Sequence, residues 1–299
     1  MNNPRVLSIQ SHVVYGYVGN KCATFPLQLL GFDVDAINSV QLSNRPGYRV
    51  SQGQVLNEKD LDDLIEGIAA NNLDTSYTHL LTGYVRNSSL LKAIEKVVCS
   101  LKRKNPNLIY VCDPVLGDNG RLYLPEDFVP IFRESIIPMA DIIAPNQFEL
   151  EILSEMKVDT LEKTLQAIDV LHNKGCKIIV ISSATYSDSN TLTTVASHKD
   201  GSIEKRAMIE IPKLKATFAG TGDLFSALFL AWMSKSNDIS IALENTVSTV
   251  YNVISRTIQH YNGNRDSSHN FDPKLMELKL IQSKDDIENP KILFKSEIL

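Results

Sequence analysis

The chain has 299 residues, of which 43% are hydrophobic and 22% are charged, so it can fold as one large α/β domain or two small ones. Its formal net charge of −5 argues against a general nucleic-acid binder, because such proteins usually present a basic face. The sequence opens without a basic and apolar export signal, and no apolar run approaches the roughly 20 residues that span a bilayer, so we expect a cytoplasmic protein without membrane contact.

Short apolar runs bounded by turn residues recur along the chain, and each predicts a β-strand. In chain order these strands cover residues 6–10, 78–82, 108–112, 142–144 and 177–182. Helical spacing of apolar residues appears between them, at 89–98 and 160–174. This alternation predicts an α/β fold with a central, mainly parallel sheet and helices on both faces. Because no repeat or linker is visible, we expect a single domain over residues 1–299.

The residues that follow the predicted strands are the first candidates for a site. In open α/β sheets, ligands bind beyond the carboxyl ends of the strands. The residue pairs at these ends are Ser11-His12, Gly83-Tyr84, Asp113-Pro114, Pro145-Asn146 and Ser182-Ser183. The polar segment 43–53, which contains several turn residues, is interpreted as a flap over that site.

The segment Gly220-Thr221-Gly222-Asp223 precedes an apolar run, 224–233, that predicts a helix buried on nearly every side. A glycine-rich turn before such a helix leaves free backbone N–H groups at the positive end of the helix dipole, which favours a bound phosphate. Asp223 can be an ordinary first-turn acid or a general base beside that anion site. The residues alone leave both interpretations open.

Two further turns carry groups that suit metal and phosphate. Asp113 and Asp118 flank a turn that is either ordinary turn chemistry or a magnesium site reached partly through water. Asn146 and Glu149 open a predicted helix, either as N-cap and capping-box partner or as groups that face nucleotide and metal.

Several common catalytic patterns are missing from the sequence. There is no Gly-x-x-x-x-Gly-Lys-[Ser/Thr] P-loop, no protein-kinase signature set and no Gly-x-Ser-x-Gly elbow. The six histidines and four scattered cysteines show no metal-ligand spacing, so a zinc site has no support and reduced thiols are expected. Phosphate handling must use another architecture, in which Ser182 and Ser183 are either a plain strand-end turn or hydroxyl donors to a nucleotide phosphate.

Taken together, these segments resemble the ribokinase-like superfamily and, within it, the pyridoxal kinase family. The resemblance spans nearly the whole chain and rests on residues 5–12, 16–20, 23–28, 38–41, 81–84, 113–118, 145–149, 220–223 and 247–249. The Gly-Thr-Gly-Asp element specifies only the superfamily, whereas the N-terminal run and Leu81-Thr82-Gly83-Tyr84 narrow it to the pyridoxal kinases.

The resemblance implies phosphoryl transfer from ATP, with Mg²⁺, to the 5′-hydroxyl of pyridoxal, pyridoxine or pyridoxamine in vitamin B6 salvage, and it implies a homodimer. It implies that Asp223 takes the hydroxyl proton and that the backbone N–H groups of Gly220, Thr221 and Gly222 stabilise the transferring phosphoryl group. The resemblance also implies which residues bind each ligand. The vitamer would be bound by Ser11, Val18, Pro46, Tyr84 and Asp223. ATP would be bound by Asp113, Asn146, Glu149, Ser182, Ser183, Leu214, Lys215, Ala216, Phe218 and Thr221. The Mg²⁺ ion would be held by Asp113, Asp118 and Glu149, with an activating K⁺ or Na⁺ nearby.

Three features depart from the family's usual pattern. Pro46, in the predicted flap, stands where many members carry Thr, which removes a hydroxyl and fixes φ. Ala144 stands where a Thr is common beside the metal and phosphate site, which affects the contact to a monovalent cation. The loop 118–123 is shorter than in vertebrate relatives. None of these departures involves Asp223 or its glycines.

Two other functions compete with this interpretation. The nearest is a kinase of the same superfamily that acts on hydroxymethylpyrimidine or a sugar, although the Ser11 and Tyr84 segments lack the dense polar lining expected of a sugar site. A non-catalytic vitamin carrier could keep the same fold, but the intact Asp223, its two glycines, Asp113 and Asp118 argue against it.

Overall fold

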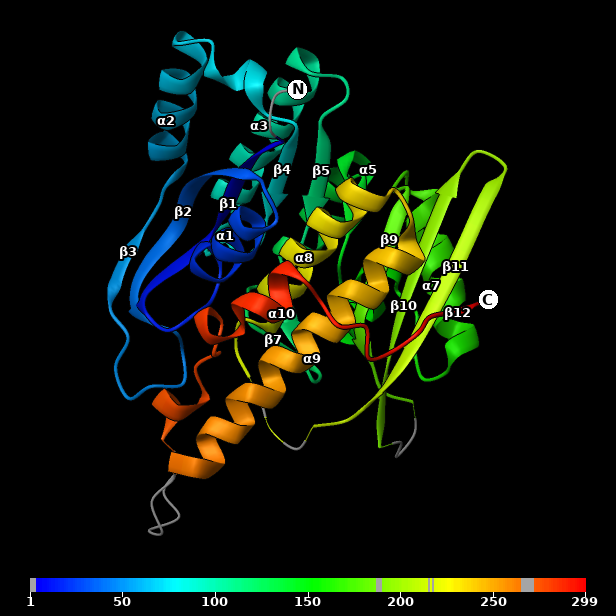
Figure 1. The fold of residues 1–299 in the computed structure, drawn as a ribbon. Coiled ribbons are helices and arrows are strands. Elements are labelled where there is room, and N and C mark those ends of the chain that lie inside the picture. The colour runs from blue at the N-terminus through cyan, green and yellow to red at the C-terminus, as the bar shows by residue number, and fades with distance from the viewer. Residues whose placement is uncertain (1–3, 187–189, 215, 217, 265–271) are drawn as a thin grey trace.

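A ten-stranded sheet runs through the middle of the molecule, with the strands in the order β12-β11-β10-β9-β8-β5-β4-β1-β2-β3 (Figure 1). The computed structural model describes residues 4–186, 190–214, 216, 218–264 and 272–299. Within these ranges, no helix is long and apolar enough to cross a membrane.

The centre of the sheet is parallel, as the sequence predicts. The parallel strands are β2 (Asp33–Asn44), β1 (Arg5–Tyr15), β4 (His79–Thr82), β5 (Ile109–Cys112), β8 (Ile142–Ile143) and β9 (Ile178–Ala184). Antiparallel strands extend both edges, namely β10 (Thr191–Asp200), β11 (Ile203–Pro212) and β12 (Glu297–Ile298) on one side and β3 (Gly53–Val55) on the other. A separate hairpin pairs β6 (Gly117–Asp118) with β7 (Arg121–Leu122).

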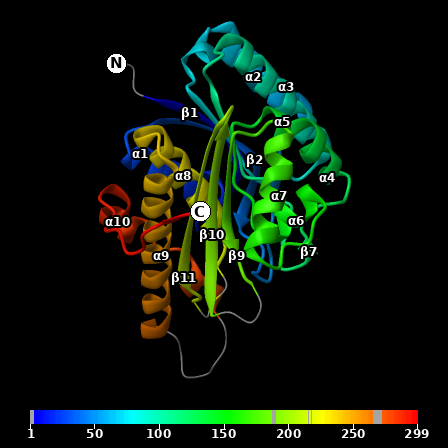
Figure 2. The same cartoon turned by 90° about the vertical axis from the view of Figure 1, so that its right-hand side faces the viewer.

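Helices cover both faces of the sheet (Figure 2). One layer contains α2 (Glu58–Ala70), α3 (Ser88–Lys104), α4 (Phe128–Ile131), α5 (Ile137–Met139), α6 (Gln147–Ser154) and α7 (Leu161–Asn173). The other contains α1 (Asn20–Leu29), α8 (Thr221–Ser236), α9 (Ile239–Asn264) and α10 (Lys284–Glu288). Each layer encloses its own hydrophobic core against the sheet, so the predicted α/β fold, with a central, mainly parallel sheet and helices on both faces, is confirmed.

Local sequence explains where the predicted helices begin. Asn87 caps α3 by accepting a hydrogen bond from the Leu90 backbone N–H, and Thr160 caps α7 in the same way through Lys163. The apolar run after Asp223 forms α8, which is buried along most of its length between the sheet and α9.

The structure corrects the sequence prediction at Ser182 and Ser183. The apolar run predicts a strand that ends at Ser182 with a turn beyond it, but β9 continues to Ala184. It continues because β10 pairs antiparallel with it, and Thr193 lies opposite Ala184. Both serines are therefore strand residues, and both are half-buried.

Candidate active site

The first turn of α8 presents unpaired backbone donors. Gly220 is the N-cap residue, with a left-handed φ of 86°, and the helix begins at Thr221. The sequence predicts a turn over the whole Gly-Thr-Gly segment, whereas Thr221 and Gly222 already belong to the helix. Because the first N–H groups of a helix have no partner four residues earlier, this end can accept an anion.

Asp223 stands in this first turn, but no hydrogen bond among the described residues joins its side chain to the N-terminal N–H groups of α8. Its Oδ2 atom instead accepts a hydrogen bond of 2.7 Å from the Gly19 backbone N–H, in the loop between β1 and α1. Among the described residues, its other carboxylate oxygen has no hydrogen-bond or ion-pair partner. Asp223 is thus held by one oxygen and free at the other.

The β1–α1 loop also brings Ser11 next to this carboxylate. A Cβ added to Gly19 would lie 1.9 Å from the Ser11 carbonyl oxygen and 2.4 Å from its hydroxyl, so only glycine allows this close approach. Ser11 is 8% exposed and sits where the pairing of β1 with β2 shifts register, between Gln10 and His12. In the described part of the chain, the Ser11 hydroxyl has no hydrogen-bond partner and can bind a ligand.

The same loop packs against the start of α8. A Cβ on Gly220 would lie 2.2 Å from the carbonyl oxygen of Tyr17, and the Cys22 thiol donates a hydrogen bond of 3.2 Å to the Gly220 carbonyl. Val18 lies between Tyr17 and Gly19 and is half-buried. The anion-binding helix end and the loop with Ser11 therefore form one packed unit.

A second group of carboxylates lies beyond β5 and β8. The pKa of Asp113 is raised well above its usual value, first by burial and then by the nearby charges of Glu149 and Asp223. Its Oδ2 accepts a hydrogen bond of 3.1 Å from the Ser226 hydroxyl, and it would lie 3.6 Å from a Cβ on Gly222. Asp113 therefore connects the strand ends to the first turns of α8.

Glu149 is the capping-box partner of Asn146, and it also binds the backbone that follows β5. Its Oε2 accepts from the Asn146 backbone N–H at 2.9 Å, while Oε1 accepts from the backbone N–H groups of Leu116 and Gly117 at 2.9 and 3.4 Å. Burial nevertheless raises its pKa to about 7, against the opposing effect of these three hydrogen bonds. The charge of Asp118, in the β6–β7 hairpin, raises it further.

Three acids thus gather at this end of the sheet, the buried Asp113 and Glu149 and the half-buried Asp223, and the described residues place no cationic side chain against them. Burial also raises the pKa of Asp223, partly offset by the Gly19 hydrogen bond. Among the described ion pairs, none includes Asp113, Glu149 or Asp223. Within the same residues, no group of three or more His, Cys, Asp or Glu side chains could hold a metal ion alone. This arrangement fits a cation that draws further ligands from phosphate and water.

The remaining candidate residues lie in different surroundings. Asn146 is occupied within the fold, because its Oδ1 accepts from the Glu149 N–H and its Nδ2 donates to the Gly117 carbonyl. Tyr84 follows β4 and is half-buried, with its carbonyl bound by the Ser39 hydroxyl at 2.6 Å. Pro46 is exposed in the connection between β2 and β3.

The predicted nucleotide segment falls between β11 and α8. Leu214 and Phe218 are half-buried and Ala216 is exposed, and Phe218 packs against the core around α8. Lys215 lies outside the described residues.

The sequence names Ser11-His12 as a strand-end pair but does not indicate the buried polar atoms beside it. Gln10 is fully buried, and among the described residues neither its Oε1 atom nor Nδ1 of His12 has a hydrogen-bond partner. Nor does the sequence indicate the Gly19 N–H that orients Asp223. The only signal was the Gly16-Tyr17-Val18-Gly19 pattern, which indicates a tight turn but not what the turn contacts.

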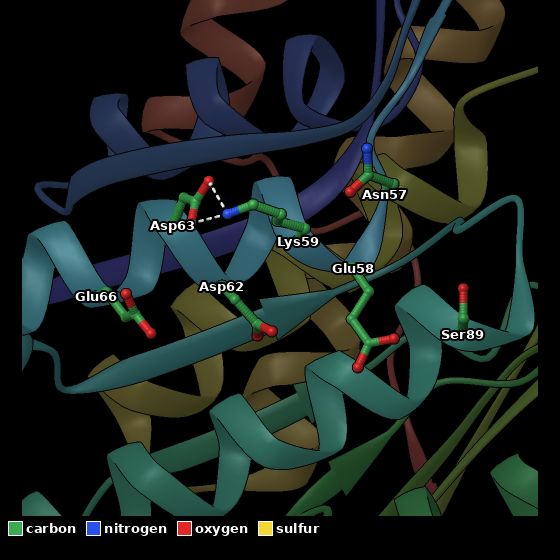
Figure 3. Close-up of a pocket in the computed structure, with 7 residues that line it drawn as sticks. All are labelled: Asn57, Glu58, Lys59, Asp62, Asp63, Glu66 and Ser89. Carbon is green, nitrogen blue, oxygen red and sulfur yellow. Dashed lines mark hydrogen bonds and ion pairs between the residues drawn. The ribbon is translucent and has the colours of Figure 1, made fainter.

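A different hollow, of about 620 Å³, lies on the surface beside α2 (Figure 3). It is lined by Asn57, Glu58, Lys59, Asp62, Asp63, Glu66 and Ser89. Its one lysine, Lys59, is paired with Asp63 at 2.9 Å. An excess of carboxylates repels phosphate, so this hollow is unsuited to a nucleotide.

A free helix N-terminus beside a carboxylate held by Gly19, at the carboxyl ends of a parallel sheet, suits phosphoryl transfer to a hydroxyl group, and together with the fold it places the chain among small-molecule kinases of the ribokinase-like fold. The family model described as phosphomethylpyrimidine kinase matches residues 33–267. The chain is 46% identical to pyridoxal kinase of Homo sapiens, covering 99% of this chain and 98% of that protein. It is 47% identical to pyridoxal kinase of Arabidopsis thaliana, covering 98% and 94%.

A solved structure of pyridoxal kinase from Leishmania donovani, in complex with ADP and pyridoxamine, has the same fold. It superposes with a TM-score of 0.91 at 34% identity, covering 99% of this chain and all of that one. The chain therefore belongs to the pyridoxal kinase family.

Proposed function

We propose that this chain transfers the γ-phosphoryl group of ATP to the 5′-hydroxyl of pyridoxal, and also of pyridoxine and pyridoxamine. The observation that carries the proposal is the hydrogen bond from Gly19 to Asp223, which sets a carboxylate with one free oxygen beside Ser11 and the α8 N-terminus. The full-length relatives and the Leishmania complex with ADP and pyridoxamine support the choice of substrates.

In this proposal Asp223 is the general base. The oxygen of the 5′-hydroxyl forms the new bond to phosphorus, its proton passes to the free carboxylate oxygen, and the bond from phosphorus to ADP breaks. Burial raises the pKa of Asp223, which makes it a stronger proton acceptor than a solvated aspartate once it is ionised. The backbone N–H groups of Gly220, Thr221 and Gly222 stabilise the charge on the transferring group.

The vitamer is held by the loop side of the site. The Ser11 hydroxyl, which has no hydrogen-bond partner among the described residues, binds the polar edge of the pyridine ring. Val18 and Tyr84 pack on the ring, and Pro46 approaches from the flap. ATP would lie on the other side, along Asn146, Ser182, Ser183, Thr221, Leu214, Ala216 and Phe218.

Asp113, Asp118 and Glu149 would hold Mg²⁺, with K⁺ or Na⁺ nearby. The residues fit such a cation because Asp113 and Glu149 are buried, have raised pKa values and lack a cationic partner among the described ion pairs. When bound, the cation neutralises phosphate charge as phosphoryl transfer requires. The protein's own contribution is to fix both carboxylates, through Ser226 for Asp113 and three backbone N–H groups for Glu149.

We further propose a homodimer that works in the cytoplasm. Val14 and Tyr15, at the end of β1, are 64% and 51% exposed, which is apolar surface available to a second copy. All four cysteines are free, including the exposed Cys99, which suits a reducing compartment. Light scattering on the purified chain measures the oligomeric state, and a monomer at micromolar concentration would contradict the dimer.

A substrate panel tests the function. Purified protein with Mg²⁺ and ATP is given pyridoxal, pyridoxine, pyridoxamine, hydroxymethylpyrimidine and ribose, and ADP release and pyridoxal 5′-phosphate absorbance are followed. We expect turnover of the three B6 vitamers. Because the matching family model is described as phosphomethylpyrimidine kinase, the pyrimidine is the critical comparison. Turnover of the pyrimidine or the sugar with no turnover of pyridoxal would refute the proposal.

A further inference from the structure

Glu277 accepts hydrogen bonds from two segments that lie more than 200 residues before it in the sequence. It follows the 3₁₀ helix Pro273–Met276 and is 7% exposed. Its Oε1 accepts from Arg45 Nε at 2.8 Å and from the Tyr48 hydroxyl at 2.9 Å. Its Oε2 accepts from the Tyr17 backbone N–H at 3.2 Å. Each oxygen therefore serves a different segment.

Arg45 and Tyr48 belong to the connection between β2 and β3, which is the predicted flap 43–53. Figure 1 shows the segment after α9 lying beside this connection, in agreement with the hydrogen bonds. The side chains of Arg45 and Glu277 are 12% and 8% exposed, and no other ion pair in the described ranges has both partners so buried. A buried pair of this kind is costly to break from one side, because the remaining charge is left without a partner.

The flap side of the contact is itself ordered. The Arg45 guanidinium lies 5.5 Å from the centre of the Tyr48 ring, and Tyr15 packs edge-on against the same ring at 6.3 Å. Burial, with the neighbouring Glu277 carboxylate, raises the pKa of Tyr48, so its hydroxyl stays protonated and donates.

The other side of the contact is the loop that carries Gly19. A Cβ on Gly16 would lie 2.1 Å from Glu277 Oε2, so the loop is packed closely on the carboxylate. The Tyr17 carbonyl packs on Gly220, and Leu278, next to Glu277, reaches the same glycine, with its Cδ1 3.4 Å from an added Cβ. Two residues further along this loop, the Gly19 N–H binds Asp223.

We propose that Glu277 is a positioning residue that couples the flap to the loop orienting Asp223, so that the flap is closed when the base is held by Gly19. The proposal rests on the proposed function for the identity of the substrate and the base. Glu277 touches neither, and it acts through Tyr17 on one side and through Arg45 and Tyr48 on the other. A carboxylate is required because both oxygens must accept.

Glu277→Gln tests this requirement while keeping the shape of the side chain. The amide has one acceptor oxygen, so it can satisfy either the Tyr17 N–H or the flap donors, but not both. If the closed state falls from nearly full occupancy to about a tenth, the apparent affinity for the vitamer falls about tenfold. We expect KM for pyridoxal to rise about tenfold while KM for ATP changes less than about twofold.

Tyr48→Phe is the milder partner variant, since it removes one flap donor and leaves the Tyr17 contact intact. Glu244→Gln is the matched control, because Glu244 also accepts from three donors, Lys295 Nζ and the Ser296 N–H and hydroxyl, and its side chain is 13% exposed. We expect Tyr48→Phe to raise KM for pyridoxal about threefold, and Glu244→Gln to leave both KM values unchanged.

Hydrogen exchange of the full chain provides a readout that does not depend on turnover. We expect Glu277→Gln to speed exchange in 43–53 and in 16–20 together, and Glu244→Gln to speed neither. Faster exchange in the flap alone, equal changes in both KM values, or the same effects in Glu244→Gln would overturn the coupling. If the wild-type chain phosphorylates no vitamer, the proposed function fails, whereas the exchange comparison still decides the coupling.

Discussion

Replacing Asp223 with Asn separates the base role from the structural role of this residue. In the wild-type chain the Gly19 N–H donates to Oδ2 of Asp223 at 2.7 Å. The Oδ1 atom of an asparagine can still accept this hydrogen bond, while the amide nitrogen takes the place of the free carboxylate oxygen. The geometry is therefore kept and the proton acceptor is lost. A general base contributes about 10²- to 10⁴-fold, which corresponds to about 2.7–5.4 kcal/mol of activation free energy.

We expect kcat for pyridoxal to fall by that factor, measured as pyridoxal 5′-phosphate formation at saturating ATP, with ATP affinity by calorimetry nearly unchanged. The melting temperature should stay equal or rise, because burial raises the pKa of Asp223 and so disfavours its charged form in the folded state. Loss of activity without loss of stability is the signature of a catalytic group.

Asp238→Asn is the matched control, since Asp238 also lies at a helix start, where it accepts from the Ser240 and Ile241 N–H groups, but it is paired with Lys205 away from the site. Its kcat should match that of the wild type. An Asp223→Asn enzyme with kcat within about threefold of wild type would refute the base assignment.

Three further predictions follow from single contacts. Gly220→Ala should lower the free energy of unfolding by about 1–3 kcal/mol and also lower kcat, because the φ of Gly220 is 86° and the added Cβ would meet the Tyr17 carbonyl. Gly31→Ala is the control, since Gly31 has a similar φ of 91° but an added Cβ there would meet no atom within 4 Å. Equal effects of the two substitutions would contradict the packing argument. Ser11→Ala should raise KM for pyridoxal about 3–10-fold, as one hydrogen bond is lost, with an unchanged melting temperature; a clear drop in the melting temperature would show that Ser11 is structural. The ligand-free protein should lose stability as pH rises from about 5 to 8, because the Glu149 pKa is raised to about 7 and its proton is therefore held more tightly in the folded state. Denaturant titrations should show that the free energy of unfolding falls by an amount on the order of 3 kcal/mol, and that this fall is absent in Glu149→Gln. Parallel pH profiles for the two proteins would contradict this prediction.

Local patterns were enough to predict the architecture of the centre of the sheet. The apolar runs at 6–10, 78–82 and 108–112 all became parallel strands, because runs of this kind are stable only when both faces are covered. The edges could not be predicted in the same way. The continuation of β9 to Ala184 depends on its pairing with β10, and a partner strand is not visible in the strand's own residues.

The anion-binding helix end was also predictable, since glycines before an apolar helical run fix both the turn and the free N–H groups within a few residues. The capping box of Asn146 and Glu149 was visible for the same reason, and it is present. What the sequence left open was whether a first-turn acid such as Asp223 starts its helix or faces a ligand, because both readings need the same residue in the same place.

Sequence by itself therefore determined the family, the parallel core and the chain positions at which acids and glycines follow the strands. Tertiary structure decided how these groups face one another. Gly19 meets Asp223 across 204 residues, and Glu277 reaches Arg45 across 232. The physical reason is that periodicity and turn chemistry act over a few residues, whereas the hydrogen-bond partner of a buried carboxylate is set by which distant segments the packed core brings together.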